Sequence, residues 1–273
     1  MNPFDFEKRK HSIWRIDRET RANGELDKLH KKEYMQINSI NLDLNETIYR
    51  ICKYDHFIND LKNKTLTLVR PKLWDDPFEN FLLNSIGVLE SGVEVNLENI
   101  SNSYYSLCWS LREESDGLWR NYKGTEDFAI KIKSTTHKLF NEIYNIEDNF
   151  HTLNYFIGKV EYVNDKQIID FFNDKVDILN FQSGVEFAQT ILTKRKAFDY
   201  EEEIRVIVKN GKNRGDLLSI NCEWDNMVDE IIFDPWICVD KFDNIKSEII
   251  KLGFKGKITR SKLYEKINFK VKM

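Results

Sequence analysis

The chain has 273 residues, of which 41% are hydrophobic and 13% aromatic, so it is long enough to bury a sizeable core in one large domain or two small ones. Charged residues make up 32%, but the formal net charge is only −4, which argues against a strongly basic nucleic-acid-binding protein. No apolar run is long enough for a membrane span, the N-terminus lacks an apolar signal core, and the four cysteines form no C-x-x-C pair, so we expect a cytoplasmic protein with reduced thiols and no metal site.

The first third of the chain begins with a charged segment and continues as alternating elements. Residues 1–45 are polar and densely charged, and we expect an N-terminal extension that is partly helical and docks on a later core. A short apolar run at 48–51 predicts a strand, Asp55 predicts a helix start before 56–63, and the alternation over 65–69 predicts a second strand.

The middle of the chain carries one clear helix-start signal. Asp76 suits an N-cap, Pro77 the first helical position, and Glu79 lies three residues after the cap, which together form a capping box. A helix is therefore expected over 76–83. Further on, the sequence predicts a buried strand over 103–110, a short helix over 117–124 and an alternating strand over 127–133.

The second half of the chain is richer in strands than a regular βαβ alternation. Helices are expected over 136–157, 166–176, 185–194 and 241–252, and strands over 158–163, 203–208, 216–220, 228–233 and 256–261. No Pro-, Gly- or Ser-rich linker divides the chain. We therefore predict the α+β class, with a single domain over 46–273 built on a mixed or mostly antiparallel split sheet flanked by helices.

The strongest candidate for chemistry lies at the start of the strand over 203–208. Side chains alternate faces along a strand, so Glu201, Glu203 and Arg205 are expected on one face, opposite the apolar side chains. Neighbouring carboxylates push their pKa values apart, which allows one to stay ionised while the other holds a proton, and the three are the catalytic candidates. The alternative is a solvated strand face on which Arg205 pairs with a glutamate.

Other candidate ligand-binding residues lie on earlier elements. Arg50 stands in an apolar strand, and a buried guanidinium needs a phosphate or a carboxylate as its partner; the alternative is a structural ion pair. Trp119 and Tyr122 lie on one side of a helical turn and could stack on a nicotinamide or a base, or could pack in the core.

Several stretches resemble, in order, the bacterial family catalogued as domain of unknown function 2971. The matching motifs are D-P-F-E at 76–79, W-x-x-Y at 119–122 and Y-E-x-E-x-R at 200–205. The resemblance spans about 47–233, and the family has no agreed activity. This chain departs from the family pattern at Arg50-Ile51, where a His-aromatic pair is usual.

A more distant resemblance is to ADP-ribosyltransferases, which place an Arg or His, then a Ser or Tyr, then a Glu on successive strands. This chain offers Arg50, Ser110 and Glu201-x-Glu203 in that order. The resemblance implies NAD as co-substrate, with Arg50, Ser110, Trp119 and Tyr122 binding it. It also implies that Glu203 stabilises the departing ribosyl group and that Glu201 serves an acceptor, which is a protein, a nucleic acid or water. A bacterial toxin or anti-phage effector, with an antitoxin or regulatory partner, would follow.

Two other functional classes stay open at the level of sequence. The aromatic-rich surface and charged N-terminal arm would suit a non-enzymatic module that binds a protein or a nucleic acid. A metal-dependent nuclease would need a divalent cation, for which Asp75, Asp76, Glu79 and Glu201 are the available carboxylates.

Overall fold

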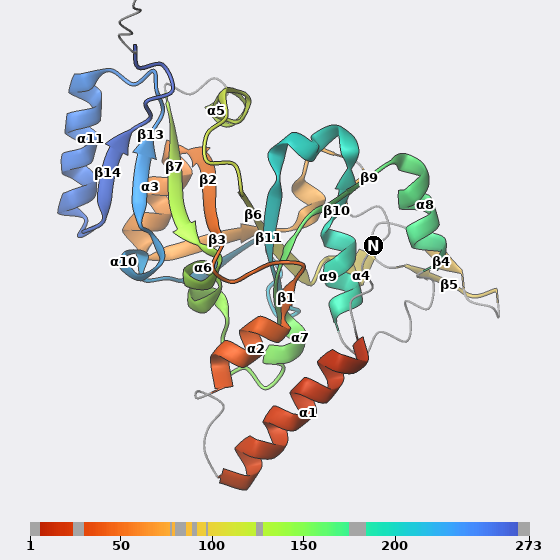
Figure 1. Cartoon of the computed structure of the whole chain (residues 1–273). Coiled ribbons are helices and arrows are strands. Elements are labelled where there is room, and N and C mark those ends of the chain that lie inside the picture. The colour runs from red at the N-terminus through yellow and green to blue at the C-terminus, as the bar shows by residue number, and fades with distance from the viewer. Residues whose placement is uncertain are drawn as a thin grey trace, which may run out of the picture.

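The computed structural model describes residues 6–23, 30–76, 78–79, 86–88, 92–96, 98–123, 128–174 and 184–266. Most of its strands form one ten-stranded sheet, and Figure 1 shows helices packed on both faces. The strands of this sheet are β1 (Ser39–Ile40), β2 (Thr47–Lys53), β3 (Thr65–Val69), β6 (Tyr104–Ser110), β7 (Ala129–Thr135), β8 (Tyr155–Lys159), β11 (Glu203–Lys209), β12 (Leu217–Asn221), β13 (Glu230–Phe233) and β14 (Lys257–Arg260).

The sheet forks at β6. On one side β6 pairs with β11 along its whole length, from Tyr104↔Lys209 to Ser110↔Glu203. On the other side it meets two strands at different points, β2 at Tyr49↔Ser110 and β3 at Val69↔Ser106. One arm then continues through β2, β7, β13 and β14, and the other through β3 and β12. In this sheet β1–β8 and β13–β14 are parallel and the other pairs antiparallel. The predicted α+β domain with a mixed, split sheet is confirmed.

The helices and remaining strands cover this sheet and its margins. The helical segments are α1 (Phe6–Asn23), α2 (Lys31–Ile37), α3 (Tyr54–Asn63), η2 (Pro71–Leu73), α4 (Glu98–Ser101), α5 (Asp116–Lys123), α6 (Thr136–Ile143), α7 (His151–Asn154), α8 (Asp165–Asp174), α9 (Val185–Ile191), η4 (Lys196–Glu201), α10 (Trp224–Met227) and α11 (Val239–Lys251). Two small two-stranded sheets are formed by β4 (Ile86–Val88) with β5 (Glu94–Asn96), and by β9 (Glu161–Val163) with β10 (Thr193–Arg195).

Strand β11 separates two apolar cores. Its side chains Ile204, Val206 and Val208 lie in the larger core, which α3 and α6 also fill. Ile207 points the other way, into a second core with α9. For Glu203 and Arg205 the predicted face is therefore confirmed, and the face that they share with Ile207 is buried too.

The N-terminal helices pack against the rest of the chain. Ile16 of α1 is fully buried in the larger core, and Arg9 donates to Asn38 Oδ1 at 2.9 Å and to the carbonyl oxygen of Thr152 at 2.6 Å. Trp14, in contrast, is 61% exposed. None of the helices in the described ranges is long and apolar enough to span a membrane.

Some predicted elements differ from the observed ones. The segment over 136–157 is not one irregular helix, because α6 and α7 are separate and β8 begins at Tyr155. The helix predicted over 185–194 ends at Ile191, and β10 follows it. Most of the helix predicted over 76–83 lies outside the described residues. Cys52 and Cys222 are buried free thiols as expected, but Cys238 is exposed.

Candidate functional site

A cleft of about 360 Å³ opens where the two arms of the sheet diverge. β2 and β6 pair only at Tyr49↔Ser110, and beyond this pair α5 and the start of β11 form the remaining walls. The cleft is lined by Tyr49, Arg50, Ile51, Cys108, Trp109, Ser110, Arg112, Leu118, Tyr122, Glu201 and Glu203. Five of the residues predicted for a site are thus brought together: Arg50, Ser110, Tyr122, Glu201 and Glu203.

The cleft is narrow in this structure. The figure of 360 Å³ includes open solvent, and between the walls there is room for only about one or two water molecules. The enclosed space is therefore far below the roughly 300 to 1,000 Å³ of ordinary ligand pockets. A larger ligand therefore requires the walls to separate.

Arg205 lies behind the cleft, and all its donor nitrogens are engaged. Its Nε donates to Glu203 Oε2 at 2.7 Å, one terminal nitrogen to the Ile191 carbonyl oxygen at 2.7 Å, and the other to Glu79 Oε2 at 3.0 Å. The guanidinium also lies over the Trp74 ring, 4.2 Å from its centre. With 1% exposure, this is not the solvated strand face of the alternative prediction, although the ion pair with a glutamate is present. Arg205 lies outside the cleft lining, so its place is that of a positioning residue.

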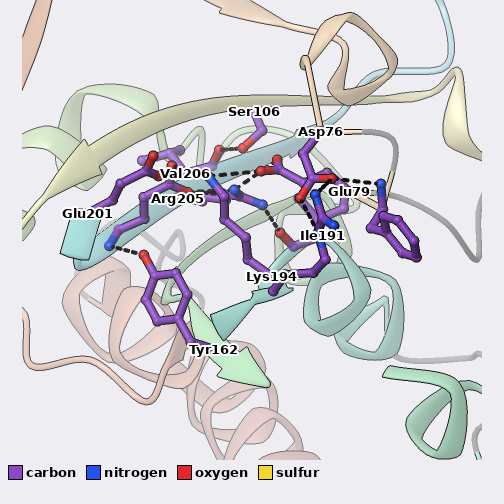
Figure 2. A network of polar contacts seen from close by, with 12 residues as sticks. Asp76, Glu79, Ser106, Tyr162, Ile191, Lys194, Glu201, Arg205 and Val206 are labelled. Atoms are coloured by element: carbon purple, nitrogen blue, oxygen red, sulfur yellow. Dashed lines mark hydrogen bonds and ion pairs between the residues drawn. The ribbon is translucent and has the colours of Figure 1, made fainter. Parts of the chain in front are cut away.

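Lys194 of β10 belongs to the same polar network as Arg205, which Figure 2 shows from close by. Its Nζ lies 2.9 Å from Glu79 Oε1, 2.7 Å from Glu201 Oε2 and 3.1 Å from Glu203 Oε1. The amine is 7% exposed, so these contacts are shielded from water. The sequence alone does not single out Lys194, because no local pattern distinguishes it from the other basic residues of 194–196.

Glu79 joins the same network instead of closing a capping box. The Asp76 side chain does accept from the backbone N–H of Phe78 at 3.0 Å, as a cap would. The Glu79 carboxylate, however, points to Lys194 and Arg205. Asp76 also binds Arg195 through two hydrogen bonds, of 2.8 and 3.2 Å. Both carboxylates therefore tie the 76–79 turn to β10 and β11.

Glu201 and Glu203 reach the cleft from different local structures. Glu201 ends the 3₁₀ helix η4, and Glu202 has a positive φ of 44°, so the strand begins only at Glu203. Strand alternation therefore does not place Glu201, contrary to the prediction. Its side chain arrives through the turn instead, and Lys194 holds it beside Glu203.

The two carboxyl groups differ in acidity. Burial, with the neighbouring Glu203 carboxylate, raises the pKa of Glu201 to about 7. Burial alone would raise the pKa of Glu203 as well, but Arg205 and Lys194 outweigh it and lower that pKa to about 2. The pair therefore holds one permanent negative charge beside one group that titrates near neutrality.

Arg50 is half-buried in the cleft wall and has no hydrogen bond or ion pair with any residue that the structure describes. The predicted alternative, a structural ion pair, is therefore not found in the described part of the chain. A guanidinium whose donors are not used by the described residues has them available for a phosphate or a carboxylate.

The two aromatic candidates on α5 lie in different environments. Tyr122 lines the cleft with its ring 40% exposed, and burial of its hydroxyl, with nearby Cys108 and Glu203, raises its pKa. Trp119 is fully buried in a small core with Ile51 and Ala129, and its indole N–H is bonded to Glu114. The prediction that Trp119 contacts a ligand is corrected, because no ligand in the cleft can reach its ring.

Ser110 closes the floor of the cleft. Its Oγ donates to the carbonyl oxygen of Glu201 at 2.5 Å and accepts from the backbone N–H of Arg112 at 2.9 Å. The hydroxyl is therefore already used to hold the turn that carries Glu201. Ser110 shapes the site through the backbone in this structure.

The carboxylates named for a metal-dependent nuclease do not converge on an empty position. Asp76 is bonded to Arg195, whereas Glu79 and Glu201 are bonded to Lys194. In the portion of the chain that can be described, no group of three His, Cys, Asp or Glu side chains is placed to hold a metal ion.

Comparisons with known proteins leave the family open. No protein-family model matches the chain, and no curated protein matches it. Solved structures of DarT from Thermus sp. 2.9, in complex with ADP-ribosylated ssDNA, carba-NAD+ and NAD+, give TM-scores of 0.38, 0.37 and 0.36 at 9%, 10% and 11% identity. The match covers 81% of this chain and 97% to 98% of those chains. At these scores no property of DarT is transferred to this chain, and the family resemblance of the motifs stays a prediction.

Proposed function

We propose that the cleft binds NAD and that the protein transfers ADP-ribose from it to an acceptor, with release of nicotinamide. The observation that carries the proposal is that one cleft brings together three ionisable groups with different properties. It combines an unpartnered guanidinium, Arg50, with a carboxylate held ionised, Glu203, and a carboxyl that titrates near neutrality, Glu201.

Arg50 is the anion-binding group of the proposal. Nothing else in the described structure uses its donors, so they are available to a phosphate or a ribose hydroxyl of the dinucleotide. Arg112, at the same cleft, is paired with Glu202 at 3.1 Å and donates to the Tyr200 carbonyl oxygen. The two arginines therefore differ in availability, and Arg50 is the one expected to contact NAD.

Glu203 acts on the bond that breaks. When the bond between C1′ of the ribose and the nicotinamide nitrogen opens, its electron pair leaves with nicotinamide and positive charge develops on the ribosyl group. A fixed negative charge in a site with little water stabilises that charge, and a carboxylate can also accept a hydrogen bond from a ribose hydroxyl. Arg205 and Lys194 keep Glu203 ionised for this role.

Glu201 acts on the bond that forms. As the acceptor's nucleophilic atom bonds to C1′, its proton passes to the Glu201 carboxylate, which later returns it to solvent. A base is most effective when its pKa lies near the working pH, and the pKa of about 7 meets this condition. The acceptor is a protein side chain, a nucleic acid or water.

The Tyr122 side chain must move for NAD to enter the cleft. Tyr122 is 40% exposed at the cleft, whereas Leu118 on the same helix is 5% exposed. An outward rotation of the Tyr122 side chain widens the mouth and leaves the ring free to stack on the nicotinamide.

A nuclease is less well supported, because no three ligating side chains in the described part of the chain converge to hold a metal ion. No specific contact favours a non-enzymatic interaction module. The proposed chemistry suits a toxin or an anti-phage effector, because modification of an essential acceptor harms the cell that contains it. An antitoxin or regulatory partner would then be required to protect the host.

The test measures NAD binding and nicotinamide release on the same purified protein. A ligand that binds only the folded state stabilises it by about 2.7 kcal/mol at a hundred times its dissociation constant, so NAD should raise the thermal midpoint. Nicotinamide release should be lost in Glu203→Gln and kept in Glu202→Gln, the exposed neighbour. No change of midpoint with millimolar NAD, and no nicotinamide release, would reject the proposal.

A further inference from the structure

Lys194 has a set of contacts that the proposed reaction does not by itself require. The chain contains a second buried lysine, Lys131, which is 2% exposed and bonds to the Glu113 carbonyl oxygen at 2.6 Å and to Glu114 at 3.1 Å. That buried amine meets a single carboxylate, Glu114. Lys194 instead meets three carboxylates, and two of them line the cleft.

The two buried cations, Lys194 and Arg205, are shared unequally between Glu201 and Glu203. Glu203 receives Lys194 on one oxygen and Arg205 on the other. Glu201 is bonded to Lys194, and no bond to Arg205 is found for it in the described structure. With three carboxylates and two cations, one negative charge is left uncompensated when all the groups are ionised. The geometry assigns that excess to Glu201, because it is the cleft carboxylate with a single cation.

We propose that Lys194 is a positioning residue that fixes Glu203 in its ionised form and makes Glu201 the cleft carboxylate that takes up and gives up a proton. The inference rests on the proposed function in one respect: the proton that Glu201 takes up is the one that leaves the acceptor. The division of roles, with Glu203 ionised and Glu201 exchanging a proton, is a property of the protein without any ligand.

The physical basis is the compact charge of an ammonium group. Lys194 Nζ donates hydrogen bonds to Glu201 and Glu203 and lies 2.9 Å from Glu79 Oε1, so one ammonium group ties the three carboxylates together. Two close carboxylates cannot both ionise easily, and the one with more cationic contacts keeps its charge. The other charged and titratable groups around the pair are Arg205, Arg50, Cys108, Tyr122, Tyr162 and Tyr200.

The test observes the carboxyl groups directly. Protein labelled with ¹³C at the glutamate side-chain carboxyl is titrated by NMR, and Glu201→Gln and Glu203→Gln assign the two signals. The wild type should show one signal that titrates near neutrality, lost in Glu201→Gln. In Lys194→Met the midpoint of Glu201 should rise by about one pH unit or more, because its only cation is removed.

Three variants keep the test decisive. Lys131→Met removes an equally buried, carboxylate-bonded lysine elsewhere and should leave the Glu201 midpoint unchanged. Lys194→Gln keeps a hydrogen-bonding group without the charge and should reproduce the shift if the methionine variant folds poorly. Lys194→Arg keeps the charge and should restore the midpoint to within about half a pH unit of the wild type.

The outcomes separate this inference from the NAD proposal. An unchanged Glu201 midpoint in folded Lys194→Met or Lys194→Gln overturns the role of Lys194, whatever NAD does. A shifted midpoint in a protein that neither binds NAD nor releases nicotinamide supports Lys194 and rejects the proposed reaction. If both hold, the pH limb of nicotinamide release should move with the NMR midpoint in the same variants.

Discussion

Glu203 and Ser110 are direct partners across β11 and β6, so the first residue of one strand faces the last residue of the other. The cleft is therefore built where two central strands end. Residues at strand ends have neighbours that are turns, and the turn after β6 and the turn before β11 supply Arg112 and Glu201 to the same site.

Replacement of Glu203 by glutamine should abolish most of the activity. The amide keeps the shape of the side chain but cannot offer a negative charge to the developing ribosyl cation, so the rate of nicotinamide release should fall on the order of 10² to 10³-fold. The matched control is Glu202→Gln, a 41% exposed neighbour paired with Arg112, which should keep its rate within about twofold. Equal rates in both variants would remove Glu203 from the mechanism.

Replacement of Arg50 by alanine should weaken NAD binding without weakening the fold. Hydrogen bonds to charged groups contribute about 1.5 to 3 kcal/mol, which corresponds to a loss of roughly 10 to 150-fold in affinity by calorimetry. The thermal midpoint without ligand should not fall, because Arg50 has no partner in the described structure. Lys133→Ala, a half-buried cation on β7 outside the cleft, serves as control. A large fall of the midpoint in Arg50→Ala would point to a structural role.

Replacement of Arg205 by alanine, in contrast to Arg50→Ala, should lower the stability of the fold. Loss of Arg205 leaves Glu79 and Glu203 with Lys194 as their shared cation, and removal of one member of a buried ion network costs about 3 to 5 kcal/mol in the free energy of unfolding. Urea denaturation measures this directly. A cost below about 1 kcal/mol would mean that the network does not hold the cleft together.

The face on which Arg205 lies could be predicted, but its partners could not. Alternation along 203–208 is a local rule, and it correctly set Ile204, Val206 and Val208 apart from Glu203 and Arg205. The Glu79 carboxylate, which accepts from Arg205, is 126 residues away in the chain. The local sequence around Glu79 satisfied the capping rule so well that no tertiary role was needed to explain this residue.

The α5 residues show a second limit of sequence reasoning. Trp119 and Tyr122 are three positions apart, so both project to nearby sides of the helix. The boundary between core and cleft falls between them, and it is set by Ile51 and Ala129 on two strands that no helical pattern reveals. Arg50 was placed correctly in a buried strand, whereas its lack of a partner became apparent only from the assembled walls of the cleft.

The stability of the protein should fall between about pH 4.5 and 7 because of Glu201. The pKa of this group is raised from 4.5 to about 7 in the folded state, so in this window the folded protein holds a proton that the unfolded chain has lost. Stability therefore decreases as pH rises through the window. Glu203, whose pKa is lowered to about 2, has the opposite sign and contributes stability that is lost as pH falls from 4.5 toward 2.

The measurement for this prediction is urea unfolding at a series of pH values. Glu201→Gln should show a flatter profile between about pH 4.5 and 7 than the wild type, because the amide does not titrate. Other groups titrate in both proteins, so the difference between the two curves is the quantity to examine. Parallel curves would show that Glu201 titrates at its ordinary value.

The fork in the sheet has a consequence for local opening. Near the cleft the arm that carries Arg50 is joined to β6 by one backbone pair, Tyr49↔Ser110, whereas β6 and β11 are joined along their whole length. Amide hydrogens at this junction can exchange with solvent through small separations of β2 from β6, without global unfolding. A molecule held by Arg50 on β2 and by Glu203 on β11 would bridge the junction. Its binding should then slow amide exchange around Tyr49 and Ser110 while leaving the middle of the β6–β11 pair unaffected.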